Sequence, residues 1–128
     1  MANRMIPMGE FKSEFNKLLG TQIAEQTIYR SSGLVAHMLK RKHYKCLKYI
    51  DFIPDIIDKP DYIGINPNET SGESIEFIKK YGDCVVLVGV KLDRNENYLY
   101  VSTVHDIQES KLQRRLHSGR LKVVNAVI

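Results

Sequence analysis

Apolar residues in the first part of the chain recur at helical spacing. In residues 9–20, Phe11, Phe15 and the two leucines after them predict a helix that stops at Gly20. Glycine is common just beyond the last residue of a helix. The mostly polar segment 21–30 is predicted to be a short extended piece.

A second helix is predicted over residues 31–45, where either of the two serines at its start could cap the first turn. Its apolar stripe consists of Leu34, Val35, Met38 and Leu39. Residues 46–60 continue the helical pattern, which we expect to be bent or broken at Pro54 and ended by Pro60.

Beyond Pro60 the pattern becomes that of β-strands, which we predict over residues 61–67, 73–83, 84–92 and 98–107. Residues 73–83 also admit a helix, but their position between two turns favours a strand. Residues 84–92 are nearly all apolar, as expected of the central strand. A short basic helix over 110–119 and a last strand or tail over 121–128 complete the chain.

These elements predict an α+β fold in one domain, residues 1–128. N-terminal helices would pack on one face of an antiparallel sheet of about four strands, followed by a short basic C-terminal helix. The expected parts are an N-terminal extension (1–30), helices (31–59), the sheet (60–107), and the basic helix with its tail (108–128). The other face of the sheet, only half covered, is where a substrate could lie.

Charge is unevenly distributed along the 128 residues, although the net charge is only +4. Basic residues concentrate in 40–48 and again in 111–122, and acidic residues lie mainly between these segments. Such a separation can steer a polyanion to one side of a molecule. The two cysteines form no disulfide framework, and no apolar run reaches membrane-spanning length. A reducing, cytoplasmic setting without a membrane is therefore expected.

His37 and His43 are the histidines of the second predicted helix. Six residues apart, they point about 120° away from one another and cannot both bind one ion from a regular helix, so we expect no metal site. Either ring could instead transfer a proton near neutral pH. The simpler interpretation is a polar residue that closes a helix face.

Residues 98–107 should present alternate side chains to opposite faces of the sheet. One face would hold Tyr98, Tyr100, Ser102 and Val104, and the other Leu99, Val101, Thr103 and His105. The tyrosine face suits stacking on bases and hydrogen bonding to sugar or phosphate, although aromatic residues on a half-exposed sheet more often serve packing.

The segment ESKLQRRLHSGRLK, residues 109–122, crowds cations together. If it is helical, Lys111, Arg114 and Arg115 cover one side, and Arg120 follows just past the helix end. Guanidinium groups match the oxygens of phosphate, so this segment could form a phosphate pocket. The usual role of such a run is a solvated helix face.

Three pieces, taken in order, resemble a known family: HMLKRKH followed by YIDFIPDIIDKPDYIG, then VVLVGVKLDRNENYLYVSTVHDI, then ESKLQRRLHSGRLK. From about Ser31 to Lys122 the chain resembles the phage-associated nucleases grouped with barnase, EndoU, the colicin ribonucleases and RelE. The resemblance implies N-terminal helices followed by an antiparallel sheet of about four strands.

The resemblance also implies endonucleolytic RNA cleavage without metal or cofactor, in which the 2′-hydroxyl attacks the adjacent phosphorus and leaves a 2′,3′-cyclic phosphate. His37 would be the leading acid/base, Thr103 a donor to phosphate, and the cations that stabilise developing charge would be Lys111, Arg115 and Arg120. The expected substrate-binding residues are Lys40, Arg41, His43, Tyr100, Ser102, Arg114 and Lys122. His43 is also the second choice as acid/base, and the other proton-transfer group is not identified.

Two other functions compete with the ribonuclease. The first is a non-catalytic RNA- or protein-binding module that keeps the basic groove, and the second is a hydrolase that pairs Cys84 with His105. The expected partners are RNA and an acidic inhibitor protein that restrains the enzyme in its own cell. The oligomeric state is left open, and a phage-encoded protein or one delivered into a host cytoplasm fits the resemblance.

Overall fold

The computed structural model of the chain describes residues 4–40, 44–67, 74–82, 84–93 and 95–124. The strands are β1 (Met5–Phe11), β2 (Gln26–Ser31), β3 (Tyr62–Ile65), β4 (Ser74–Tyr81), β5 (Cys84–Asp93), β6 (Tyr98–Ile107) and β7 (Leu121–Val123). The helices are α1 (Phe15–Leu19), α2 (Leu34–Lys40), the 3₁₀ helix η1 (Tyr44–Phe52), α3 (Ile53–Asp58) and α4 (Glu109–His117).

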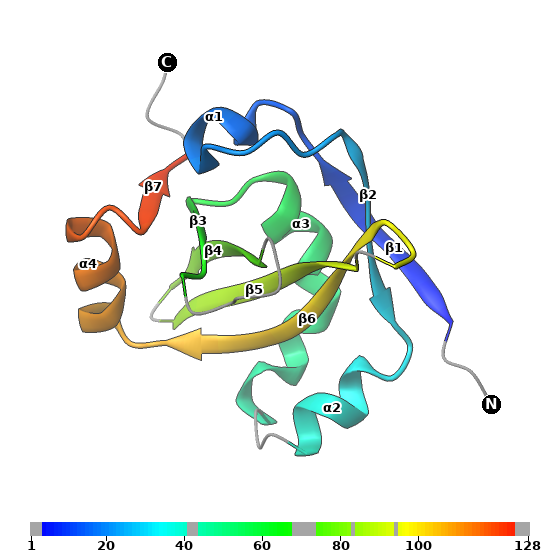
Figure 1. Cartoon of the computed structure of the whole chain (residues 1–128). Coiled ribbons are helices and arrows are strands. Elements are labelled where there is room, and N and C mark those ends of the chain that lie inside the picture. Colours follow the sequence, from blue (N-terminus) through cyan, green and yellow to red (C-terminus); the bar gives the residue numbers. More distant parts are fainter. Residues whose placement is uncertain (1–3, 41–43, 68–73, 83, 94, 125–128) are drawn as a thin grey trace.

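The strands form one seven-stranded sheet in the order β1-β2-β6-β5-β4-β3-β7. β2 pairs with β6 in parallel, and the other pairs are antiparallel. Figure 1 shows β1 and β2 at one side of the molecule and β7 with α4 at the other. The apolar strand β5 lies in the middle of the sheet, which confirms the prediction for residues 84–92.

The predicted fold class is wrong, most clearly in the N-terminal part of the chain. Instead of helices on a four-stranded antiparallel sheet, the structure has a mixed seven-stranded sheet with short helices. The helical spacing of Phe11 and Phe15 is real, but the first residue ends β1 and the second begins α1. Their rings still contact each other, with centroids 5.8 Å apart, because the chain turns between them. Pairing with β2 therefore overrides a local pattern that is equally compatible with a helix.

The later elements match the sequence pattern more closely. Residues 74–81 form a strand and residues 109–117 a helix, so these two predictions are confirmed. The predicted break near Pro54 is also present, because η1 gives way to α3 at Ile53 and the proline occupies the first turn of α3. A proline is tolerated there, since its missing N–H would have no partner within the helix.

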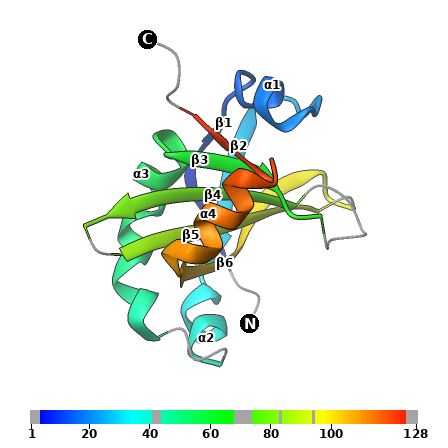
Figure 2. The ribbon, with the colours of Figure 1, turned by 90° about the vertical axis from the view of Figure 1, so that its left-hand side faces the viewer.

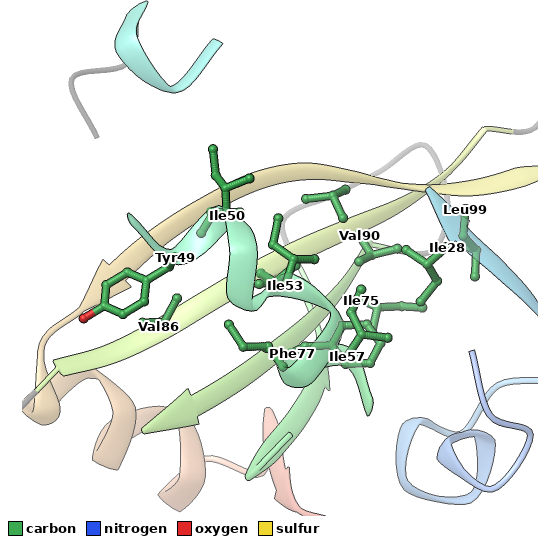
Figure 3. Close-up of a cluster of buried hydrophobic side chains, with 14 of the residues drawn as sticks. Ile28, Tyr49, Ile50, Ile53, Ile57, Ile75, Phe77, Val86, Val90 and Leu99 are labelled. Atoms are coloured by element: carbon green, nitrogen blue, oxygen red, sulfur yellow. The ribbon is translucent and has the colours of Figure 1, made fainter. Parts of the chain in front are cut away.

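One face of the sheet is filled by apolar side chains. Ile53 and Ile57 of α3 are fully buried against Ile75, Phe77 and strand residues beyond them, as Figure 3 shows. Phe15 of α1 makes edge contacts with both Phe11 and Phe77. Because these phenylalanines come from β1 and β4, strands well apart in the sheet order, the sheet must curl around this core.

The opposite face is covered only in part. Leu112 of α4 is fully buried in a smaller cluster with Ile78, Leu87 and Leu121. Figure 2 shows α4 on the near side of the strands, with α3 lying elsewhere on the sheet. Part of this face along β6 is not covered by α4, and polar side chains line a cleft there. Among the described residues, no helix has the length and apolar character needed to cross a membrane.

Candidate active site

A β-bulge in β6 shapes the open face. Gly89 of β5 pairs with Thr103, whereas the next residue of β5, Val90, pairs with Val101. Ser102 is therefore an extra residue, and the alternation of faces is inverted beyond it. Such a bulge is invisible to a simple count of alternate positions.

This inversion corrects the predicted faces of β6. Val104, expected beside Tyr100 and Ser102, is fully buried in the apolar core. Thr103 and His105, expected beside the buried leucine and valine of the strand, instead line a cleft together with Tyr100 and Ser102. The bulge thus brings four polar side chains of one strand to the same surface.

The cleft has a volume of about 750 Å³ and lies over β4, β5 and β6, with the start of α2 as one wall. Its polar lining includes the side chains of His37, Glu76, Lys91, Ser102, Thr103 and His105. These residues come from four separate elements, so only the folded sheet brings them together.

Two glycines make room for the carboxylate at the centre of this face. Gly64, Glu76, Gly89 and Thr103 pair in register across β3, β4, β5 and β6. A Cβ atom at Gly64 would collide with the backbone oxygen of Arg120, and one at Gly89 would lie 2.9 Å from Cγ2 of Thr103. The missing side chains therefore let the segment before β7 and the bulged strand approach Glu76 from both sides.

Glu76 holds two guanidinium groups over the sheet. Arg120 donates two hydrogen bonds to it, from Nε to Oε1 at 3.1 Å and from Nη2 to Oε2 at 2.9 Å. Nη1 of Arg115 forms an ion pair with Oε2 at 3.5 Å. The Glu76 side chain is 7% exposed, and the side chains of Arg115 and Arg120 are 17% and 18% exposed. A carboxylate so deeply buried requires this pairing.

Burial lowers the pKa of Arg115 from its usual value. Glu76 opposes that shift, whereas the neighbouring charges of Arg120 and Arg114 add to it. The guanidinium groups at this place are thus crowded, with one buried carboxylate serving two of them.

Sequence reasoning missed Glu76 as a site residue. The available signal was a lone carboxylate in SIEFI, a strand whose other side chains are almost all apolar. Every described residue from Ser74 to Ile78 is buried, so the charge had to be paired.

The two histidines of the cleft are held differently. His37 lies on the exposed side of α2, whose start is fixed by a hydrogen bond from the Gly33 N–H to Oγ of Ser31. Nδ1 of His105 lies 2.9 Å from the carbonyl oxygen of Asp106. Because a carbonyl can only accept, this contact assigns the proton to Nδ1 and makes Nε2 the basic nitrogen of the neutral ring. His105 was absent from the predicted ribonuclease site.

The predicted cations Lys111, Arg114, Arg115 and Arg120 all line one depression at the end of α4, and none of them lines the cleft. We call this depression the α4 hollow. Arg115 and Arg120 reach Glu76, which lines the cleft.

The other predicted binding residues are scattered. Lys40 is exposed at the end of α2, and Lys122 is exposed on β7. Arg41 and His43 lie outside the described residues.

Tyr100 belongs to a group of three rings beside the cleft. Tyr98 lies 5.8 Å from Tyr100 and 6.2 Å from Tyr29, measured between ring centroids. Tyr29 pairs with Tyr100 across the parallel strands β2 and β6, and all three side chains are half-buried. Nothing in the sequence marked Tyr29 as a site residue, because its position beside Tyr100 depends on the parallel pairing of β2 with β6.

The pairing of Cys84 with His105 is wrong. Cys84 packs against the main apolar core, whereas His105 lines the cleft on the opposite face of the sheet. In the described part of the chain, no three His, Cys, Asp or Glu side chains are grouped so that they could hold a metal ion.

Comparison with protein families gives a match over residues 7–114 to the family described as phage-Barnase-EndoU-ColicinE5/D-RelE like nuclease 3. The chain belongs to this nuclease family. Membership supports a nuclease function in general. Comparison with curated proteins gave no match, and comparison with solved structures gave none either.

The family match covers a different part of the chain from the resemblance seen in the sequence. It begins in β1, so the two N-terminal strands belong to the nuclease domain, although the recognised resemblance started only near Ser31. It ends at Arg114, before Arg115 and Arg120. The contacts of those two arginines with Glu76 are therefore known only from the structure of this nuclease.

Proposed function

We propose that this nuclease is a metal-independent endoribonuclease that cleaves RNA by attack of the 2′-hydroxyl, leaving a 2′,3′-cyclic phosphate and a free 5′-hydroxyl. The observation that carries the proposal is the cleft itself. It combines two histidines from separate elements with a carboxylate that holds two guanidinium groups, in a member of a nuclease family. These groups supply what transphosphorylation needs: a base, an acid and positive charge.

His105 and His37 are the proposed proton-transfer groups. With Nδ1 of His105 donating to a backbone carbonyl, Nε2 is the proposed acceptor for the proton of the 2′-hydroxyl. His37, on the α2 wall of the same cleft, would protonate the leaving 5′-oxygen. The pair replaces the single acid/base that the sequence suggested.

Arg120 and Arg115 are the proposed stabilisers of the charge that develops on the phosphorane. Glu76 would act as a positioning residue, because its two oxygens fix the plane of the Arg120 guanidinium. Thr103 and Ser102 line the same cleft and can donate hydroxyl hydrogen bonds to phosphate oxygens.

The three tyrosines are the proposed base-binding surface. Half-buried rings beside the cleft can stack on unpaired bases, a contact that favours single-stranded RNA. Tyr100 lines the cleft directly, and Tyr98 and Tyr29 extend the surface away from it.

We also propose an acidic inhibitor protein as a partner, acting in the cytoplasm where RNA is exposed to the enzyme. The cations of α4, together with exposed Lys122 close to Gly119, offer a basic surface for such a protein. Co-purification of the tagged enzyme from its native host should recover an acidic protein that blocks cleavage. Recovery of the enzyme alone, fully active, would contradict this idea.

The test is cleavage of a single-stranded RNA in the presence of EDTA. We expect cutting with cyclic-phosphate ends, and no cutting where a 2′-deoxynucleotide replaces the residue that attacks. His37→Ala and His105→Ala should each lower kcat/KM by about 10²–10⁴-fold. His117→Ala is the matched control, because His117 is an exposed histidine of α4 outside the cleft.

Three results would count against the proposal. Activity that EDTA abolishes and a divalent cation restores would indicate a metal-dependent nuclease. An equal loss of kcat/KM in all three histidine variants would show that catalysis does not depend on the two histidines of the cleft. Salt-sensitive RNA binding without cleavage would favour the non-catalytic RNA-binding module.

A further inference from the structure

The α4 hollow is a cationic depression distinct from the cleft. It has a volume of about 720 Å³ and is lined by the side chains of Lys111, Arg114, Arg115 and Arg120, with Ser118 and Gly119 closing one side. Its described lining contains four cations and no carboxylate.

The cations of the α4 hollow are poorly neutralised by the protein. Only Arg120 makes short, paired hydrogen bonds with Glu76. Nη1 of Arg115 is buried, lies 3.5 Å from Glu76, and has no hydrogen-bond partner among the described residues. Lys111 and Arg114 form no hydrogen bond or ion pair with side chains in the described part of the chain.

The carbonyl groups at the C-terminal end of α4 accept hydrogen bonds from other donors and not from these cations. The Ser118 N–H donates to the carbonyl oxygen of Arg114, and the Gly119 N–H donates to that of Leu116. Oγ of Ser118 donates to the carbonyl oxygen of Arg115. Since the last turn is capped by its own backbone and a serine, the side-chain charges remain available to a ligand.

The α4 hollow adjoins the proposed scissile site. Arg115 and Arg120 line the hollow, and both contact Glu76, which lines the cleft. A strand of nucleic acid that places one phosphodiester in the cleft can therefore place a neighbouring one in the hollow. The negative charge of that phosphodiester would meet the side chains of Lys111 and Arg114, beside the guanidinium groups of Arg115 and Arg120.

We propose that the α4 hollow is a second phosphate subsite, which binds a phosphodiester next to the one in the cleft. The inference rests on the proposed nuclease function and deepens it, because it makes the substrate an oligonucleotide. Lys111 and Arg114 are then positioning residues for the RNA strand. They hold its backbone at a distance from the reacting atoms.

The test compares the binding of a short and a longer RNA. Fluorescently labelled 2′-O-methyl dinucleotide and pentanucleotide cannot undergo 2′ attack, so their Kd values are measurable on the intact enzyme by anisotropy. For the unsubstituted protein we expect the pentanucleotide to bind at least about tenfold more tightly. In Lys111→Ala/Arg114→Ala, that gain should fall several-fold, and the slope of log Kd against log salt should fall by about 1.

A charge-matched control separates a built subsite from general attraction. Arg4→Ala/Lys17→Ala removes the same two charge types from exposed positions outside the α4 hollow and should keep the length-dependent gain. A gain that survives in Lys111→Ala/Arg114→Ala, or that falls equally in both double variants, would overturn the subsite.

The outcome also separates this inference from the proposed function. Loss of the gain in Lys111→Ala/Arg114→Ala, with no cleavage of ordinary RNA by the unsubstituted enzyme, would support the subsite and reject the chemistry. Cleavage of RNA together with an unchanged gain would support the chemistry and reject the subsite. Failure of the unsubstituted protein to bind either RNA would reject both.

Discussion

From Ser74 to Ile78 both faces of β4 are buried, yet they are buried by different means. Ile75 and Phe77 face the apolar core of α3 and α1 and are fully buried there. Ser74, Glu76 and Ile78 face the other way, where Glu76 meets Arg115 and Arg120 beneath α4. One face is thus stabilised by removal of apolar surface from water, and the other depends on charge pairing.

This contrast explains why the site lies where it does. A face filled by apolar side chains leaves no room for substrate and no groups to act on it. The other face is covered by α4 only at one end, so a carboxylate held by arginines sits beside a cleft that solvent can enter. We therefore expect the polar face to contribute less to folding stability than the apolar face, and it is the face suited to chemistry.

Removal of a large core side chain should have the largest effect on stability. Phe77→Ala leaves a cavity against Phe15 and Ile57, and we expect it to lower the free energy of unfolding by about 3–5 kcal/mol. Urea denaturation measures the change. Thr103→Ala, on the cleft side, should cost less than about 1 kcal/mol, and a reversed order would break the comparison of the two faces.

Neutralisation of the buried carboxylate should cause the second largest loss in the free energy of unfolding. Glu76→Gln leaves Arg115 and Arg120 crowded without their counter-charge, and we expect a loss of about 3 kcal/mol in the free energy of unfolding. Because Arg120 would lose its fixed orientation, kcat/KM should fall as well. The double variant Glu76→Gln/Arg120→Gln should be less destabilised than the sum of the two single variants. Additive losses would show that the pair is not coupled.

Insertion of a methyl group beside the carboxylate should come third. Gly64→Ala would force a Cβ atom into the backbone oxygen of Arg120, with an expected loss of about 2 kcal/mol and a lower kcat. Gly9→Ala is the matched control on the core side, where the new Cβ would lie 3.3 Å from Cγ2 of Ile57, a side-chain atom that can shift. Equal losses in the two variants, measured by thermal unfolding, would remove the special role of Gly64.

The smallest expected effect on stability is that of Tyr81, at the end of β4, and it depends on pH in alkaline solution. Burial, followed by the hydrogen bond to Oδ2 of Asp55 at 2.9 Å, raises the pKa of the Tyr81 hydroxyl above its usual value. The folded state thus favours the neutral phenol, whose contribution is complete below the ordinary tyrosine pKa of about 10 and is lost as the pH rises toward the folded pKa.

Tyr81→Phe should therefore be less stable than the unsubstituted protein at neutral pH, by about 0.5–1 kcal/mol, because the hydrogen bond to Asp55 is lost. The difference should shrink above pH 10, as urea denaturation at several pH values would record. Tyr100→Phe, on the cleft side, is the comparison variant. A difference for Tyr81→Phe that grew with pH would contradict the assigned direction.

Local sequence patterns predicted the later part of the molecule well. β4, β5, β6 and α4 occur close to where apolar periodicity and charge placed them, because each element buries one or two faces with a clear period. The same reasoning failed for residues 5–31. There, two short strands and one turn of helix satisfy a spacing that also fits a longer helix.

The sequence by itself determined which residues could serve chemistry on phosphate: the cations of 111–122, the histidines, and the tyrosines of β6. Only the tertiary structure decided which of them meet. The bulge at Ser102 turned Thr103 and His105 toward the cleft, and the parallel pairing of β2 with β6 added Tyr29. Contacts between residues distant in the chain depend on strand order and register, which are set by the burial of the whole sheet and leave no period in any single segment.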